Sequence, residues 1–379
     1  MVLVLPSPAA LGERYARHLL STARDYLQLA PSLGERHVPI ARAVARAVAR
    51  RPKDALACFA SPTVATPIRC APLAADLPAH ADRIARSLDA LGPHLLFELS
   101  LRSLFLDGET VDWPDPVEAL RSPSLGLSLV PPPGPLRFSS GAVDGEGGAR
   151  FTLDGERRGF AVSPSWLPLA GVTRLALADE NPLASLEAHP DKTGNALDLG
   201  GRPVDEWCAS LERAIALATA HLPGLRDELV LLLHEIVPVG FDAERHLSAS
   251  YREALGTIYL SLHPDPITMA EALVHEFQHT KLNLLSYSDP LLENAFEPLF
   301  KSPIRPDPRP LWGILLAAHA FLPVAVMHRA FKDSAKSRLQ EIDRDNREAM
   351  EMLRAHGRFT PAGAELFAAL DALDRAHMG

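Results

Sequence analysis

The segment of residues 271–281 constrains this chain more than any other. It contains His275-Glu276-x-x-His279, the H-E-x-x-H pattern of metal sites carried on a helix. Side chains at positions i and i+4 lie on one face of an α-helix, one turn apart. Such a helix directs both imidazoles at one point and leaves the carboxylate of Glu276 beside them. The pattern therefore predicts a helix that binds a metal ion.

The neighbouring residues also favour a helix. Thr268 is predicted to be its N-cap, and Glu271 three residues later would complete a capping box. We expect Lys281 to be a solvated flank. The apolar residues expected to bury the sides of the helix are Leu273, Val274, Phe277 and Leu282.

Composition limits the class of protein. The 379 residues are 47% hydrophobic and 22% charged, which is typical of soluble globular proteins. A net charge of −9 argues against a nucleic-acid partner. The cysteines, Cys58, Cys70 and Cys208, are too few and too scattered for a disulfide framework. The start lacks the basic region of a signal peptide, and no apolar run approaches the length of a membrane span. We expect a cytoplasmic protein without a membrane partner.

The texture of the chain predicts three regions and an α+β fold. Residues 1–102 form a helical N-terminal region, residues 103–202 a strand-rich middle, and residues 203–379 an HExxH metal-binding catalytic domain with C-terminal helices. The last region would contain a zincin-like metal helix followed by a C-terminal helical bundle. Periodicity predicts helices over 8–60, 77–101, 203–221, 311–331, 333–356 and 361–377. Strands are expected over 229–239 and 256–262.

Two histidines need a third protein ligand to complete a metal site. Glu297 lies 18 residues after His279, close to the spacing at which many zinc peptidases place a ligand. His319 lies in an apolar stretch, where it is either a ligand or a core histidine bonded to a backbone carbonyl. The other downstream candidates are Asp289, Glu293 and His328. The residues alone leave the third ligand open.

Other residues have two readings each. Arg305 and Arg309, in a proline-rich loop, could clamp a dicarboxylate cosubstrate or bridge Asp307 and helix ends. His263 could face substrate or bond the backbone in a turn. We assign no role to His234 or His246.

The motif by itself allows two kinds of chemistry. As a zinc hydrolase, the protein would use Glu276 as the general base that deprotonates a metal-bound water. The same histidines also suit Fe(II) with open positions for a cosubstrate and O₂. A third reading is a non-catalytic peptide-binding module with a structural metal. Strands of the middle region could offer it an edge for an extended peptide.

Several segments carry a resemblance to a known family. The most specific parts are the His-Glu-Phe-Gln-His core of residues 275–279 and the Asp-Pro-Arg-Pro loop of residues 307–310. The supporting segments are residues 180–184, 187–201, 237–246 and 259–266. On these residues the chain resembles the HExxH-motif proteins of ribosomal peptide natural product pathways. It looks most like the stand-alone α-ketoglutarate-dependent HExxH-type peptide β-hydroxylases.

The resemblance implies a non-heme Fe(II)/2-oxoglutarate-dependent dioxygenase that hydroxylates a Cβ in a ribosomally synthesised precursor peptide. It implies Fe(II) held by His275 and His279, with His319 as our choice for the third ligand. Arg305 or Arg309 would bind the far carboxylate of α-ketoglutarate, and Glu276 would orient a ligand or a water. The alternative is a zinc-dependent metallopeptidase. In it Zn(II) would replace Fe(II), Glu297 would be the third ligand, and Glu276 would be the general base. A homodimer is left open.

Overall fold

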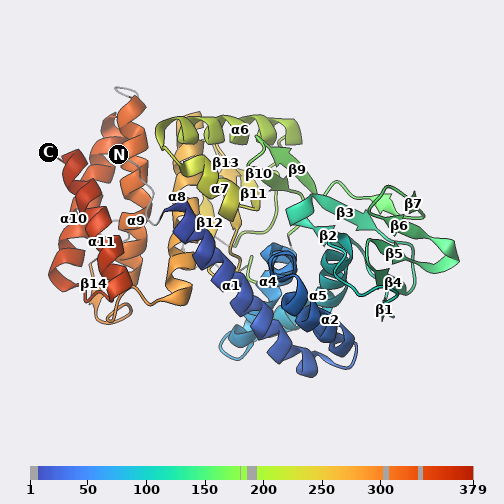
Figure 1. Ribbon diagram of the computed structural model, residues 1–379. Coiled ribbons are helices and arrows are strands. Elements are labelled where there is room, and N and C mark those ends of the chain that lie inside the picture. Colours follow the sequence, from blue (N-terminus) through green and yellow to red (C-terminus); the bar gives the residue numbers. More distant parts are fainter. Residues whose placement is uncertain (1–6, 180, 186–193, 302–306, 332–335, 379) are drawn as a thin grey trace.

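The computed structural model of the protein describes residues 7–179, 181–185, 194–301, 307–331 and 336–378. Helices form both ends of the chain and strands occupy its middle (Figure 1). The predicted α+β class, with helical ends and a strand-rich centre, is therefore confirmed.

The N-terminal region is helical, as the periodicity predicts. Ser7 caps the first helix by accepting a hydrogen bond from the main-chain N–H of Ala10, which satisfies one of the free donors at a helix start. Leu11, Tyr15 and Leu19 follow at helical spacing and are buried. The helices are α1 (Pro8–Leu29), α2 (His37–Arg50), α3 (Pro52–Ala57), α4 (Pro62–Cys70) and α5 (Ala81–Leu101).

Two small antiparallel sheets fill the first part of the middle region. The first contains, in spatial order, β1 (Val111–Trp113), β4 (Leu136–Ser139), β5 (Ala142–Asp144), β6 (Arg150–Thr152) and β7 (Arg157–Arg158). The second contains β2 (Leu120–Ser122), β3 (Leu127–Val130) and β8 (Ala161–Val162).

A third sheet packs against the helix that carries the H-E-x-x-H pattern. Its order is β12 (Ser248–Ser250), β13 (Thr257–Leu262), β11 (Glu235–Phe241), β10 (Thr173–Ala176) and β9 (Trp166–Leu169). Strands β10, β11 and β13 are parallel, whereas the edge strand β12 runs antiparallel to β13. The sheet takes strands from both sides of the boundary predicted at residue 202. The division into domains stays a prediction.

The strand predicted over residues 229–239 is wrong in its first half. Residues 229–232 are the last turn of helix α7 (Leu225–Leu232), and the strand starts only at Glu235. Asp227 and Glu228 lie in the first turn of α7, where the helix dipole favours negative charge. An apolar run of this length fits a buried helix as well as a strand, so periodicity could not separate them.

Helix α8 (Pro266–Ser288) carries the H-E-x-x-H pattern and lies between the third sheet and the C-terminal helices (Figure 1). The four apolar side chains expected to bury its flanks are buried, as predicted. The predicted cap is wrong: Asp265 is the N-cap, and its carboxylate accepts hydrogen bonds from the N–H groups of Ile267 and Thr268. Glu271 therefore does not form the predicted capping box.

The C-terminal region contains three helices at the predicted places, α9 (Leu311–His328), α10 (Lys336–His356) and α11 (Pro361–Met378). A short hairpin of β14 (Leu299–Phe300) and β15 (Arg309–Pro310) precedes them, and α6 (Val204–His221) packs on α8. The segment Leu311–Phe331 is long and apolar enough to span a membrane, contrary to the expectation from the sequence. Its most apolar stretch is 67% buried inside the protein, as in the core helix of a soluble protein.

Candidate metal centre

The two histidines of the motif face each other on α8. The ring centroids of His275 and His279 are 4.3 Å apart at an interplanar angle of 77°. This is the arrangement expected of positions i and i+4 on one helix face. The side chain of His275 is 20% exposed, so this end of the pair opens towards solvent.

Burial favours the neutral form of both rings, which is the form that binds metals. Burial lowers the pKa of His279 to about 3, with the charge of His275 contributing in the same direction. Burial also lowers the pKa of His275, although the charge of Glu276 partly offsets it. The buried Nδ1 atoms of both rings have no hydrogen-bond partner among the described residues. Such an atom is costly to bury unless something else binds the ring.

His319, on α9, lies near this pair. It is only 4% exposed, and burial, followed by the charges of Lys281 and His279, lowers its pKa to about 3. Its ring hydrogen-bonds the main chain of Gln278, and its Nδ1 has no partner in the described part of the chain. A main-chain bond suits a core histidine and equally a ligand whose second nitrogen is fixed. Both readings of His319 therefore remain.

A three-residue metal site is not assembled by these side chains as they stand. Within the described residues, no group of three His, Cys, Asp or Glu side chains is arranged to hold a metal ion. The facing rings and their unsatisfied nitrogens fit two ligands of a metal, and the third ligand stays a prediction.

Glu276 is held by two hydroxyl groups from the edge strand β12. Ser248 Oγ donates to its Oε1 at 2.6 Å, and Ser250 Oγ donates to its Oε2 at 2.7 Å. The carboxylate is buried, and Oε1 lies 4.0 Å from Nε2 of His275. Burial alone would raise the pKa of Glu276, but His275, His279 and the two hydroxyls together hold it below its ordinary value. Glu276 is therefore an ionised, fixed neighbour of the histidines.

Lys281 is not the solvated flank that the sequence suggested. Its side chain is 2% exposed, and its Nζ bonds both carboxylate oxygens of Glu228 at 2.8 and 2.9 Å. A charge this deeply buried needs a paired and hydrogen-bonded partner. Helix α7, whose residues 229–232 were predicted to be strand, supplies it.

A cleft of about 510 Å³ opens beside His275. Phe321 of α9 lines it and packs its ring 4.6 Å from that of His275. Ser248 and His246 line it from the β12 side, and Asp265 from the helix start. The motif helix thus borders a space large enough for a small cosubstrate.

One wall of the cleft is charged. Arg338 of α10 donates from Nη2 to Oε1 of Glu271 at 2.5 Å, and Nε2 of His328 lies 2.8 Å from Oε2. Burial would raise the pKa of Glu271, but these two partners hold it at about 2. The guanidinium of Arg338 also lies 5.9 Å from the ring centroid of Phe321. Arg338 therefore presents a positive charge one aromatic ring away from His275.

The other predicted ligands lie elsewhere. Asp289 accepts a hydrogen bond from Arg14, while Glu293 and Glu297 are exposed. None of the three lines the cleft. His328 bonds Glu271, as described above.

Arg309, one of the two predicted cosubstrate arginines, is not among the residues that line the cleft. Arg309 pairs with Asp307 at 2.8 Å, which is the bridging role foreseen for it, and Arg305 lies outside the described residues. His263 accepts a hydrogen bond from the main-chain N–H of Asp265, as a turn residue would.

Sequence reasoning missed several residues of the cleft. These are His246, Ser248, Phe321 and Arg338, and it also missed Ser250, which bonds Glu276 beside the cleft. A Ser-Ala-Ser alternation was the only local signal of the serines, since it places both hydroxyls on one face of a strand. Burial lowers the pKa of His246 to about 4, and its Nε2 is buried without a partner among the described residues.

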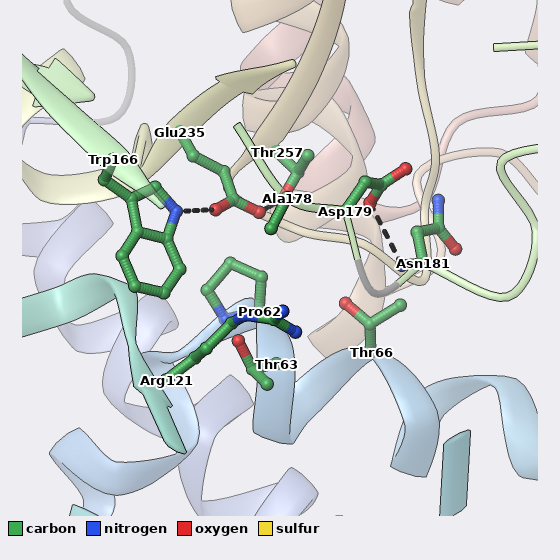
Figure 2. Close-up of a pocket in the computed structure, with 10 residues that line it drawn as sticks. All are labelled: Pro62, Thr63, Thr66, Arg121, Trp166, Ala178, Asp179, Asn181, Glu235 and Thr257. Carbon is green, nitrogen blue, oxygen red and sulfur yellow. Dashed lines mark hydrogen bonds between the residues drawn. The ribbon is translucent and has the colours of Figure 1, made fainter. Parts of the chain in front are cut away.

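A second polar hollow lies away from α8, where α4, β2 and the third sheet meet (Figure 2). Its volume is about 10 Å³, close to what one water molecule needs. Glu235 accepts hydrogen bonds there from Trp166 Nε1 at 3.0 Å and Thr257 Oγ1 at 2.9 Å. Asp179 accepts from Asn181 N at 3.0 Å and Tyr259 Oη at 3.1 Å. This chamber is small and its carboxylates are satisfied, so we regard it as structural.

Comparison with known proteins adds no assignment. No protein-family model matches the chain, and none of the curated proteins compared with it is similar.

Proposed function

We propose that this protein is an Fe(II)- and α-ketoglutarate-dependent oxygenase that hydroxylates a Cβ of a residue in a ribosomally made precursor peptide. The observation that carries the proposal is the pairing of His275 and His279 beside a 510 Å³ cleft that also contains Arg338. Such a cosubstrate requires metal ligands, a space beside them and a cation that binds its carboxylate.

In this proposal α8 is a zincin-like metal helix. His275 and His279 would hold Fe(II), with His319 as the third ligand. When bound, the metal with α-ketoglutarate and O₂ supplies the oxidising power for C–H hydroxylation. The three free thiols, Cys58, Cys70 and Cys208, fit the reducing cytoplasm proposed as its compartment.

The protein's own side chains bind and orient. We assign the far carboxylate of α-ketoglutarate to Arg338, because Arg338 lines the cleft and Arg309 does not. The cosubstrate would share the guanidinium with Glu271, which already pairs with it. Phe321 packs against one side of His275 and would help to orient it. Glu276 would stay ionised beside the histidines and orient a ligand, since both of its oxygens already accept hydrogen bonds.

The test is an anaerobic reconstitution with Fe(II), followed by α-ketoglutarate and then O₂. A visible charge-transfer band that forms with α-ketoglutarate and bleaches with O₂, with release of succinate, is the expected result. A candidate precursor peptide should then gain the mass of one oxygen atom without cleavage. A protein that forms no such band and retains zinc would exclude the proposal.

The second candidate is a zinc metallopeptidase with Glu276 as its general base. The carboxylate lies 4.0 Å from His275, which favours this reading. The exposure of Glu297, its expected third ligand, weighs against it. Peptide cleavage that disappears in Glu276→Gln would support the peptidase, and activity retained in that variant would exclude it.

A further inference from the structure

The edge strand β12 is attached to two different partners by alternate residues. Ser248 and Ser250 are two positions apart, so their side chains share one face of the strand, and both point to Glu276 of α8. Ala249 between them packs on the other face with Val237 and Tyr259. The strand thus contacts the metal helix through hydroxyls and the sheet core through a methyl group.

The pairing register fixes this arrangement. Ser248 lies opposite Leu260, and Ser250 lies opposite Ile258 of β13. A slip of one residue would turn Ala249 towards Glu276 and both hydroxyls towards the apolar face. A buried carboxylate without those donors would be strongly destabilised, so the register and the contact with Glu276 support each other.

The two donors restrain Glu276 more than one would. Each hydroxyl binds a different carboxylate oxygen, at 2.6 and 2.7 Å, so both the position and the rotation of the group are set. Hydrogen bonds to an ionised acceptor are short and about twice as strong as neutral ones. The oxygen held by Ser248 is the one that lies 4.0 Å from His275.

We infer that Ser248 and Ser250 are positioning residues, which hold the Glu276 carboxylate against the metal-binding histidines and so couple the edge strand β12 to the metal helix α8. The inference rests on the proposed metal site. The serines touch neither the metal nor the cosubstrate in this account, and they act through Glu276. Partners of this kind commonly change metal affinity or activity roughly 10–100-fold when removed.

The experiment uses Co(II) as a spectroscopic probe in the full chain. Ser248→Ala, Ser250→Ala and the double variant are titrated with Co(II), and affinity and visible spectrum are recorded. We expect the double variant to bind Co(II) roughly tenfold more weakly, with an altered spectrum. Ser248→Thr, which keeps the hydroxyl, should restore the affinity of its site to within about threefold. Ser286→Ala, which removes a hydroxyl on α8 that bonds only Asn283 O among the described residues, is the control.

A second background separates positioning from general loosening of the fold. In Glu276→Ala the two serine substitutions should cause no further loss, because their effect passes through the missing carboxylate. A double variant with the affinity and spectrum of the wild type overturns the inference, and so does an equal further loss in Glu276→Ala. A wild type that binds Co(II) but releases no succinate removes the hydroxylase and leaves this inference standing. A wild type that binds no Co(II) overturns both.

Discussion

Lys281 and His279 lie two residues apart on α8, and their polar atoms have opposite surroundings. Both carboxylate oxygens of Glu228 bind the ammonium group of Lys281. The buried Nδ1 of His279 has no partner among the described residues. Folding favours satisfied polar groups, so a charge with a complete partner set is explained by stability alone. A buried nitrogen without a partner needs another explanation, such as a bound ion or water.

The small polar chamber of Figure 2 resembles the Lys281 pair, because its buried charged groups also have hydrogen-bond partners. Its two carboxylates, Glu235 and Asp179, have hydrogen-bond donors on their oxygens. Burial alone therefore does not mark a functional site in this protein. The two facing imidazoles of α8, next to a cleft and with buried Nδ1 atoms that lack a partner among the described residues, distinguish the candidate metal centre from the structural clusters.

The largest expected effect tests the Lys281–Glu228 pair, whose polar groups are hydrogen-bonded to each other. Lys281→Met leaves Glu228 as an unpaired buried charge, and we expect the free energy of unfolding to fall by about 3–5 kcal/mol. The double variant Lys281→Met/Glu228→Leu should recover most of that loss, because no charge is left unpaired. Urea denaturation of the three proteins measures this. A single variant within about 1 kcal/mol of the wild type would show that the pair is not structural.

The next prediction tests His279, whose buried Nδ1 has no hydrogen-bond partner among the described residues. His279→Ala should weaken Zn(II) or Co(II) binding more than about 100-fold, which is about 2.7 kcal/mol. His263→Ala, at a turn histidine bonded to the main chain, is the matched control and should leave the affinity unchanged. Isothermal titration calorimetry compares them. Equal affinities in the two variants would mean that the imidazole pair is not a metal site.

The chamber gives a pH-dependent prediction. Burial, with the charge of Asp179 as the next contribution, raises the pKa of Glu235 from 4.5 to about 7. The folded state therefore keeps a proton that the unfolded state has lost, and stability falls as the pH rises from about 4.5 to about 7. Glu235→Gln lacks this loss, so above pH 7 it should exceed the wild type by up to about 3 kcal/mol.

Thermal or urea unfolding across that range checks the prediction. The advantage of Glu235→Gln should vanish below about pH 4.5, where the carboxyl is protonated in both states. A constant difference at every pH would instead indicate a packing effect of the amide.

The smallest expected effect sharpens the assignment of the cleft. Arg338→Gln should raise the KM for α-ketoglutarate about tenfold, or about 1.4 kcal/mol, with little change in metal affinity. Arg309→Gln should change the KM less than about twofold, because Arg309 is not among the residues that line the cleft. Succinate release at varied cosubstrate concentration measures both. A larger KM increase in Arg309→Gln than in Arg338→Gln would assign the cosubstrate carboxylate to Arg309 instead.

Local patterns predicted a large part of the fold. The i, i+4 spacing placed His275 and His279 together, and helical periodicity located the C-terminal helices within a few residues. The errors occur where two structures suit one pattern. The run around Leu229 is apolar enough for a strand or a helix, and Asp265 competed successfully with Thr268 for the cap because its carboxylate reaches two N–H groups.

The sequence by itself determined the helix that carries H-E-x-x-H, the facing imidazoles and the α+β class, because these depend on contacts within a few residues. Tertiary structure decided which distant residues surround the motif. Ser248, Phe321 and Arg338 reach the cleft from β12, α9 and α10, and Glu228 meets Lys281 from α7. No spacing along the chain encodes these approaches, since packing of the helices against the sheet sets them. The partner of each buried charge, and hence its role, was therefore visible only in the folded chain.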